Sequence, residues 1–148
     1  TINKIMTKLN PYLNFDGTCE EAFLFYQSVF GGEFMGGIFR MGDAPGMDHL
    51  SDKDKNKVMH MALPVGTDLI MGSDILPDIG HILTVGNNNQ ISIFPDSRED
   101  AERLFNGLSA GGKIIVPLQD QFWGDYYGNF IDKFGVVWMI NYTNPKNK

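Results

Sequence analysis

The stretch PYLNFDGTCEEAFLFYQSVFGG, residues 11–32, decides the fold because the chain contains a second version of it. The second version is QISIFPDSREDAERLFNGLSAG, residues 90–111, and the two align without a gap. They share identical residues at matching positions, namely Phe15 and Phe94, Glu20 and Glu99, Ala22 and Ala101, and Gly32 and Gly111. A repeat of this kind indicates two copies of one structural unit within a single fold.

Both versions combine a short strand pattern with a longer helix pattern. Thr18 and Ser97 are the candidate helix caps, because a hydroxyl oxygen can accept a backbone hydrogen bond in the first helical turn. Apolar residues then recur at helical spacing, as Ala22, Phe25, Tyr26 and Val29 in the first version and Ala101, Leu104, Phe105 and Leu108 in the second. The repeated element is therefore a strand followed by an amphipathic helix.

Three strand patterns after each helix complete two βαβββ units, which places the chain in the α+β class. In the first unit we expect strands at 12–15, 33–41, 58–65 and 67–74 and a helix at 19–30. In the second unit we expect strands at 90–94, 113–118, 125–132 and 136–142 and a helix at 98–108. The predicted organisation is a disordered lead-in over 1–9, one domain over 10–142 with units at 10–75 and 90–142 and a connector at 76–89, and a tail over 143–148.

Residues 42–57, GDAPGMDHLSDKDKNK, are dense in Gly, Pro, Asp and Lys. This composition predicts a long surface loop. Long loops in compact domains often act as lids or binding elements, and the alternative is a merely solvated connection.

Composition limits the classes of partner. The chain has 148 residues, 43% of them apolar, and a net charge of −6, which opposes binding to phosphate backbones and argues against nucleic acid as a partner. No apolar run is long enough to span a bilayer, and a single cysteine agrees with a reducing compartment. We therefore expect a soluble cytoplasmic protein.

The closing stretch FWGDYYGNFIDKFGVVWMIN, residues 122–141, is the most specific motif in the chain. Together with PYLNF, EEAFLFYQSVFGG and LIMGSD, it resembles the PhnB-like branch of the vicinal oxygen chelate superfamily, the glyoxalase, bleomycin-resistance and dioxygenase group. Members of this branch often carry the label 3-demethylubiquinone-9 3-methyltransferase. The resemblance implies curved, mixed sheets that close around a cup, in a homodimer.

Metal-using members of that superfamily place His or Glu on the first and last strand of each unit. On this chain those positions carry Pro11, Met71, Gln90 and Met139, and a slip of one residue substitutes Tyr12 for Pro11. Proline lacks a side-chain donor, thioethers are soft ligands and an amide is a weak one. We therefore predict no metal site and no cofactor.

Four residues remain as candidates for chemistry. His49, His60 and His81 lack a spacing that would hold two ligands on one element. His60 lies on a predicted strand and is the candidate catalytic residue, as a general base in the cup. Cys19 lies in the first helical turn, where a thiol can become reactive, but the favoured interpretation is a small packed residue.

Methyl transfer from S-adenosylmethionine would usually require a glycine-rich turn between a strand and a helix. The glycine pairs at 31–32, 36–37 and 111–112 follow helices or lie in a strand region instead. The sequence therefore argues against the methyltransferase activity that the family label suggests.

Side chains on the predicted strands indicate a soft apolar pocket with a few polar contacts. The candidates for its lining are Met71, Ser73, Gln90, Ser92, Trp123, Tyr126 and Met139. The alternative is that the apolar members of this set simply form the core.

Strand alternation decides which side chains can reach such a pocket. Gln90 and Ser92 share one strand face, whereas Ile91 and Ile93 point toward the second helix. For the strand at 12–15 the sequence leaves both orientations open.

The leading hypothesis is a metal-free, PhnB-like homodimeric protein that binds a small, partly apolar molecule in its sheet cup. The alternative is a metal-dependent lyase, isomerase or dioxygenase of the glyoxalase type with a different ligand set. A third possibility is a protein-interaction module with a filled interior.

Overall fold

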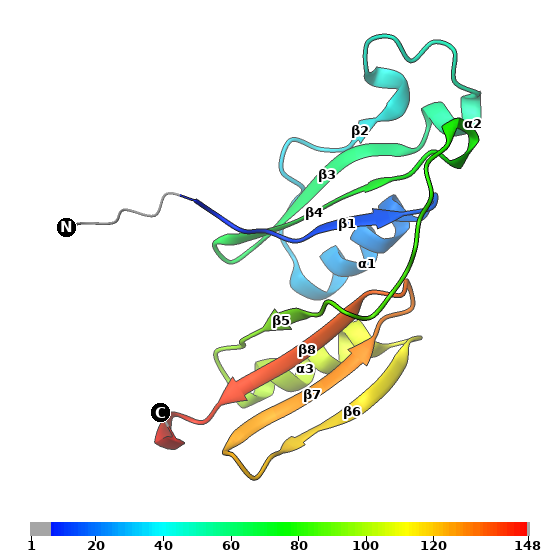
Figure 1. Ribbon diagram of the computed structural model, residues 1–148. Helices are drawn as coiled ribbons and strands as arrows, with labels where there is room; N and C mark the ends of the chain where they lie inside the picture. The colour runs from blue at the N-terminus through cyan, green and yellow to red at the C-terminus, as the bar shows by residue number, and fades with distance from the viewer. Residues whose placement is uncertain (1–6, 148) are drawn as a thin grey trace, which may run out of the picture. The chain divides into compact units, whose positions relative to one another are not determined.

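The computed structural model describes residues 7–147, so the first six residues of the expected lead-in and the last residue of the expected tail lie outside the described chain. The chain divides into two compact units (Figure 1). The first unit contains the chain up to Phe23 together with Gly32–Leu83, and the second contains Leu24–Gly31 together with the chain from Thr84 onward. Within the described residues, no helix is long and apolar enough to cross a membrane.

A four-stranded mixed sheet forms the first unit, in the order β1-β4-β3-β2. Its strands are β1 (Tyr12–Phe15), β2 (Phe39–Arg40), β3 (Val58–Val65) and β4 (Asp68–Asp74). Strand β1 runs parallel to β4, and the other pairs are antiparallel. Helix α1 (Cys19–Phe30) follows β1, as predicted.

The orientation of β1 is decided by packing against α1. Phe15 is 3% exposed and its ring packs edge-on against Phe23 of α1, with 6.3 Å between the ring centroids. Strand alternation turns Tyr12 and Asn14 to the opposite face. We call this the α1-distal face, and its members are Tyr12, Asn14, His60, Ala62, Met71 and Ser73.

The strand predicted at 33–41 is wrong over most of its length, because only Phe39–Arg40 pairs in the sheet. Gly36 and Gly37 have φ values of 75° and 78°, a left-handed conformation that interrupts an extended strand.

The segment predicted as a long loop contains two short helices, η1 (Met41–Asp43) and α2 (Asp52–Lys55). Met41 and Leu50 pack with Leu76 in a small buried cluster, so part of this segment has its own core. A further 3-10 helix, η2 (Pro77–Ile79), follows β4.

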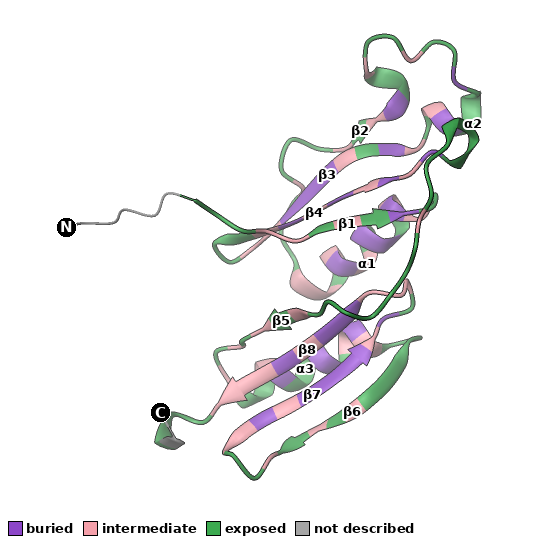
Figure 2. Ribbon diagram, viewed as in Figure 1, coloured by how far each residue is buried: buried purple, intermediate pink, exposed green. Residues whose placement is uncertain are grey.

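The second unit repeats the pattern with the sheet order β5-β8-β7-β6. Its elements are β5 (Ile91–Ile93), α3 (Arg98–Ser109), β6 (Lys113–Asp120), β7 (Asp125–Ile131), β8 (Val137–Thr143) and η3 (Pro145–Asn147). Strands β7 and β8 are mostly buried or half-buried, and the edge strand β6 is mostly exposed (Figure 2).

Helix α3 confirms the periodicity read from the repeat. Ser97 caps it by accepting a hydrogen bond from the Asp100 backbone N–H at 3.0 Å. The buried residues of the helix are Ala101, Leu104, Phe105 and Leu108. The α+β class and the tandem arrangement are therefore confirmed.

Helix α1 begins at a buried carboxylate. Asp74, at the end of β4, accepts the backbone N–H of Cys19 on Oδ1 and that of Val58 on Oδ2, both at 2.9 Å. A negative charge at a helix N-terminus is favourable.

The Cys19 side chain is fully buried, and this burial, with the charges of Asp74 and Glu20, raises the pKa of its thiol. Cys19 is therefore a small packed residue, which is the interpretation that the sequence favoured.

A second buried carboxylate organises the second unit. Asp132 is 3% exposed, and its Oδ2 accepts hydrogen bonds from the Tyr26 hydroxyl at 2.6 Å and from Trp138 Nε1 at 2.8 Å. Its Oδ1 accepts the backbone N–H groups of Phe134 at 2.8 Å and Val136 at 3.0 Å. This carboxylate fixes the turn between β7 and β8 and anchors two large aromatic side chains.

We expect Asp132→Asn to destabilise the protein strongly. The asparagine amide has one oxygen that can accept hydrogen bonds, and its N–H₂ group would face two of the donors that now bond to the second carboxylate oxygen. The free energy of unfolding should therefore fall by an amount on the order of 3 kcal/mol. Urea denaturation measures the free energy of unfolding. Asp78→Asn, at an exposed position in η2, is the matched control and should change it by less than about 0.5 kcal/mol. Equal stability of the two variants would contradict the assigned role of Asp132.

We also expect Cys19 to resist thiol reagents in the native protein. A buried thiol with a raised pKa is neutral and inaccessible, so reaction with Ellman's reagent at pH 8 should be on the order of 100-fold slower than in the guanidinium-unfolded chain. Stopped-flow absorbance compares the two rates. Rapid labelling of the folded protein would show that the first turn of α1 is open.

Candidate functional site

The residues predicted to line a pocket fall on two sheets, so each sheet is described separately. In the second unit, β7 alternates between the face that α3 covers and the face turned away from it. Phe130 packs edge-on against Phe105 of α3, with ring centroids 5.0 Å apart, and the Tyr126 hydroxyl donates to Glu102 of α3 at 3.0 Å. Tyr127 and Asn129 therefore point to the opposite face, which we call the α3-distal face.

Three predicted site residues lie with Asn129 on the α3-distal face. Met139 is opposite both Asn129 and Ser92 in the strand register. Gln90 lies just before β5, and its Oε1 is 3.5 Å from Asn129 Nδ2. The central part of the α3-distal face thus includes Gln90, Ser92, Tyr127, Asn129, Met139 and Asn141. Neutral polar groups surround one thioether here.

The alternation expected for β5 is present. Ile91 and Ile93 lie opposite Trp138 and Ile140, which are both fully buried, whereas Ser92 lies opposite the half-buried Met139. The α3-covered face is therefore apolar, and the α3-distal face is mixed.

Tyr126 does not join this group, because strand alternation places it on the α3-covered face. The Arg98 guanidinium lies 3.8 Å from the centroid of its ring and forms two hydrogen bonds of 2.8 Å with Asp120. Burial and the hydrogen bond to Glu102 raise the pKa of the Tyr126 hydroxyl. These contacts connect α3 to β6 and β7, on the face of the sheet opposite to Asn129.

Trp123 lies in the turn between β6 and β7 and is 51% exposed. Its ring centroid is 6.1 Å from that of Tyr127, and its Nε1 donates to Asp125 at 3.2 Å. Trp123 therefore borders the α3-distal face.

In the first unit, Met71 and Ser73 lie on the α1-distal face, beside Tyr12 and Asn14 of β1. Ser73 Oγ is 3.4 Å from Asn14 Oδ1. His60 is on the same face: its ring stacks on Tyr12 with centroids 5.7 Å apart, and Nδ1 lies 3.1 Å from the Tyr12 hydroxyl. The structure thus brings the candidate His60 together with a tyrosine that sequence analysis did not select.

The positions that carry metal ligands in the superfamily do not fit a divalent ion here. In the first unit they are Pro11, whose carbonyl accepts the Met71 backbone N–H at 3.1 Å, and the Met71 thioether. In the second unit they are the Gln90 amide and the Met139 thioether. Carboxylates and imidazoles are missing from all four positions. Residues 7–147 also contain no group of three or more His, Cys, Asp or Glu side chains placed to hold a metal.

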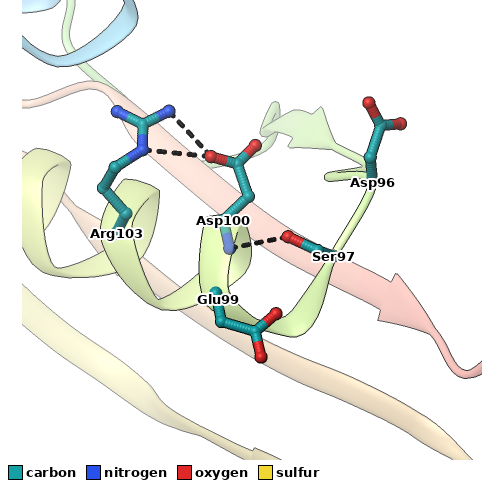
Figure 3. A pocket seen from close by; sticks show the side chains of 5 residues that line it. All are labelled: Asp96, Ser97, Glu99, Asp100 and Arg103. Atoms are coloured by element: carbon teal, nitrogen blue, oxygen red, sulfur yellow. Dashed lines mark hydrogen bonds and ion pairs between the residues drawn. The ribbon is translucent and has the colours of Figure 1, made fainter.

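A pocket of about 380 Å³ lies elsewhere, at the start of α3 (Figure 3). Asp96, Ser97, Glu99, Asp100 and Arg103 line it. Ser97 caps the helix, and both Nε and Nη2 of Arg103 bond to Asp100 Oδ1 at 3.0 and 2.8 Å. Acidic groups in a first helical turn stabilise the helix dipole, so helix stability accounts for this cluster.

The glycine pairs that follow the two long helices lie in turns and at a close packing contact. Gly31 and Gly32 follow α1 with φ values of 80° and 81°. A Cβ atom on Gly112 would lie 2.1 Å from the Ile131 carbonyl oxygen, so that pair allows β6 to approach β7. Neither pair stands between a strand and the start of a helix.

Sequence reasoning missed Tyr12, Tyr127 and Asn129. Tyr12 was left undecided because either face of β1 could have met the helix. Asn129 is a single polar residue within the run 125–132, and only the pairing of β7 with β6 and β8 shows which face it occupies.

Known proteins share this arrangement of strands and helices. The chain matches the Glyoxalase/Bleomycin resistance protein/Dioxygenase superfamily over residues 8–140. Protein YjdN of Escherichia coli strain K12 is 33% identical over 146 residues, which cover 90% of this chain and 93% of YjdN.

Two solved structures extend the comparison. Protein PA1353 from Pseudomonas aeruginosa matches with a TM-score of 0.82 and 39% identity, over 93% of this chain and 98% of PA1353. The PhnB protein from Bacillus cereus, which carries the name 3-demethylubiquinone-9 3-methyltransferase, matches with a TM-score of 0.75 and 25% identity, over 93% of this chain and all of PhnB. The resemblance drawn from the closing motif is confirmed, and the chain belongs to the glyoxalase/bleomycin resistance protein/dioxygenase superfamily.

Proposed function

We propose that the protein binds a small, partly apolar molecule at the distal faces of its sheets, without a resident metal ion. The observation that carries the proposal is the composition of these faces. Each combines a half-buried methionine, Met71 or Met139, with neutral hydrogen-bonding side chains. Adaptable thioethers and a few placed polar groups are typical of small-molecule sites.

Metal-dependent chemistry is the rival that the superfamily suggests. The ligand positions carry a proline, two thioethers and an amide, which are poor donors for hard divalent ions. Transfer of a methyl group, which the name of the PhnB relative suggests, usually requires a glycine-rich turn before a helix. The turn from β1 to α1 has Gly17 alone, and the turn from β5 to α3 has no glycine.

We also propose that the protein is a homodimer. Large apolar side chains are exposed on the second unit, among them Phe122 at 98%, Phe94 at 69% and Ile114 at 50%. Apolar groups indicate an association surface where they are contiguous, and the rings of Phe122 and Trp123, with centroids 5.1 Å apart, form such an exposed pair in the turn between β6 and β7. Sedimentation velocity on the purified protein should show a species of twice the chain mass.

The binding proposal predicts that a charge on a distal face weakens ligand binding. Hits from a screen of small aromatic and aliphatic compounds should perturb backbone amide resonances of β4 or β8. Met71→Glu or Met139→Glu should then weaken binding of hits on its own sheet at least tenfold, a loss of about 1.4 kcal/mol, because a carboxylate must be desolvated beside the ligand.

Ile82→Glu is the matched control, because Ile82 is 89% exposed and lies outside the strands. It should leave binding unchanged. Elemental analysis of chelator-free protein completes the test. A retained equivalent of metal per chain, or a screen with no hit on either sheet, would overturn the proposal.

A further inference from the structure

Asn129 is a buried polar residue whose amide orientation is fixed by its surroundings. It is 9% exposed and lies at the centre of the second sheet, on β7. The register of β6 against β7 is irregular on both sides of Val116, and the Val116 backbone N–H bonds to Asn129 Oδ1 at 3.1 Å. A backbone N–H can only donate, so the atom that it meets must be the amide oxygen.

Because Oδ1 is turned toward Val116, the Nδ2 group of Asn129 is the part of the amide that faces the α3-distal side. Asn129 Nδ2 carries two hydrogens, and it donates to Gln90 Oε1 at a long 3.5 Å. If Gln90 accepts there, its own Nε2 becomes the outward group. Asn129 Nδ2 then has one further hydrogen to donate and Gln90 Nε2 has two, and Met139 lies opposite Asn129 in the strand register.

The charged groups on this face lie at the ends of the strands. Asp125, at the start of β7, accepts the Trp123 indole N–H, and Lys113, at the start of β6, lies opposite Ile131 at the end of β7. No formal charge stands next to Asn129 among its strand partners Val116 and Met139. A charged ligand group would lose its hydration here without gaining an ion pair, whereas a neutral acceptor would gain hydrogen bonds.

We propose that Asn129 and Gln90 form a donor subsite for a neutral carbonyl oxygen of the bound molecule. The inference rests on the proposed function and narrows it: the ligand carries a ketone, ester or amide carbonyl on an apolar body. Asn129 would distinguish between ligands through its N–H groups, while its oxygen accepts the hydrogen bond from the Val116 backbone N–H.

Four probes with one apolar body test the subsite: 4-phenylbutan-2-one, 3-phenylpropanoate, 3-phenylpropylamine and propylbenzene. Titrations followed by ¹⁵N–¹H spectra give each affinity. The ketone should bind at least tenfold more tightly than the other three. It should also move the side-chain N–H₂ signals of Asn129 downfield, which propylbenzene should not do.

Asn129→Asp is the decisive variant, because its carboxylate still accepts the Val116 N–H but offers no donor. We expect ketone affinity to fall at least tenfold and the amine to become the preferred probe. Asn106→Asp, at an exposed position of α3, makes the same charge change away from this face and should alter neither affinity. Gln90→Glu, at the exposed edge, repeats the test should Asn129→Asp fail to fold.

The outcomes separate the two proposals. Binding of all four probes with equal affinity, unaffected by Asn129→Asp or Gln90→Glu, would overturn the carbonyl subsite while leaving the binding function in place. Failure of every probe to bind would overturn the binding function at the second sheet and the subsite with it.

Discussion

The carboxylate of Asp132 is the constraint on which the second unit depends. A buried charge is tolerated only when donors surround it, and Asp132 has four. Because one of these donors is the Trp138 indole, Trp138 must point to the face where Tyr26 lies. Strand alternation then turns Met139 the other way, and pairing places Ser92 and Asn129 beside it. The orientation of Trp138 toward Asp132 therefore agrees with the placement of Met139, Ser92 and Asn129 on the α3-distal face.

The first unit also contains a buried carboxylate whose oxygens accept hydrogen bonds, but the residues involved are different. Asp74 ends β4 and satisfies backbone donors of α1 and β3, whereas Asp132 follows β7 and satisfies side chains as well. An arginine–carboxylate ion pair also joins each helix to an edge strand of its sheet. The helix supplies the carboxylate in the first unit and the arginine in the second. Glu20 of α1 meets Arg40 of β2, and Arg98 of α3 meets Asp120 of β6. The repeat thus preserves the geometry of the unit and not the identity of its polar contacts, which explains why an alignment of the two copies did not reveal them.

Periodicity predicted most of the fold because each amphipathic helix and each buried strand must present one apolar face. The predicted limits of α1 and β3 are confirmed, and those of α1 followed from the candidate cap Thr18 and the glycine pair at 31–32. It failed at 33–41, where left-handed conformations at Gly36 and Gly37 outweigh the β-forming residues around them. The site was harder to predict, because the face that a side chain occupies depends on register. Tyr126 was grouped with the pocket residues for its chemistry, although it stands an odd number of positions from Asn129. Asp132 was predicted only as the last residue of the strand at 125–132, since its partner Tyr26 is 106 positions away in the sequence.

Charge is distributed unevenly between the two faces of each sheet, and this bears on what the protein can recognise. The ion pairs Arg40–Glu20, Arg98–Asp120 and Arg103–Asp100 all include a helix residue. The side chains at the centre of the α3-distal face are amides, hydroxyls and a thioether. Attraction between charges is long-ranged and tolerant of geometry, whereas hydrogen bonds between neutral groups depend on distance and direction. A ligand on this face would therefore be selected by its shape and by the position of its acceptor atoms, and its net charge would contribute mainly a desolvation cost.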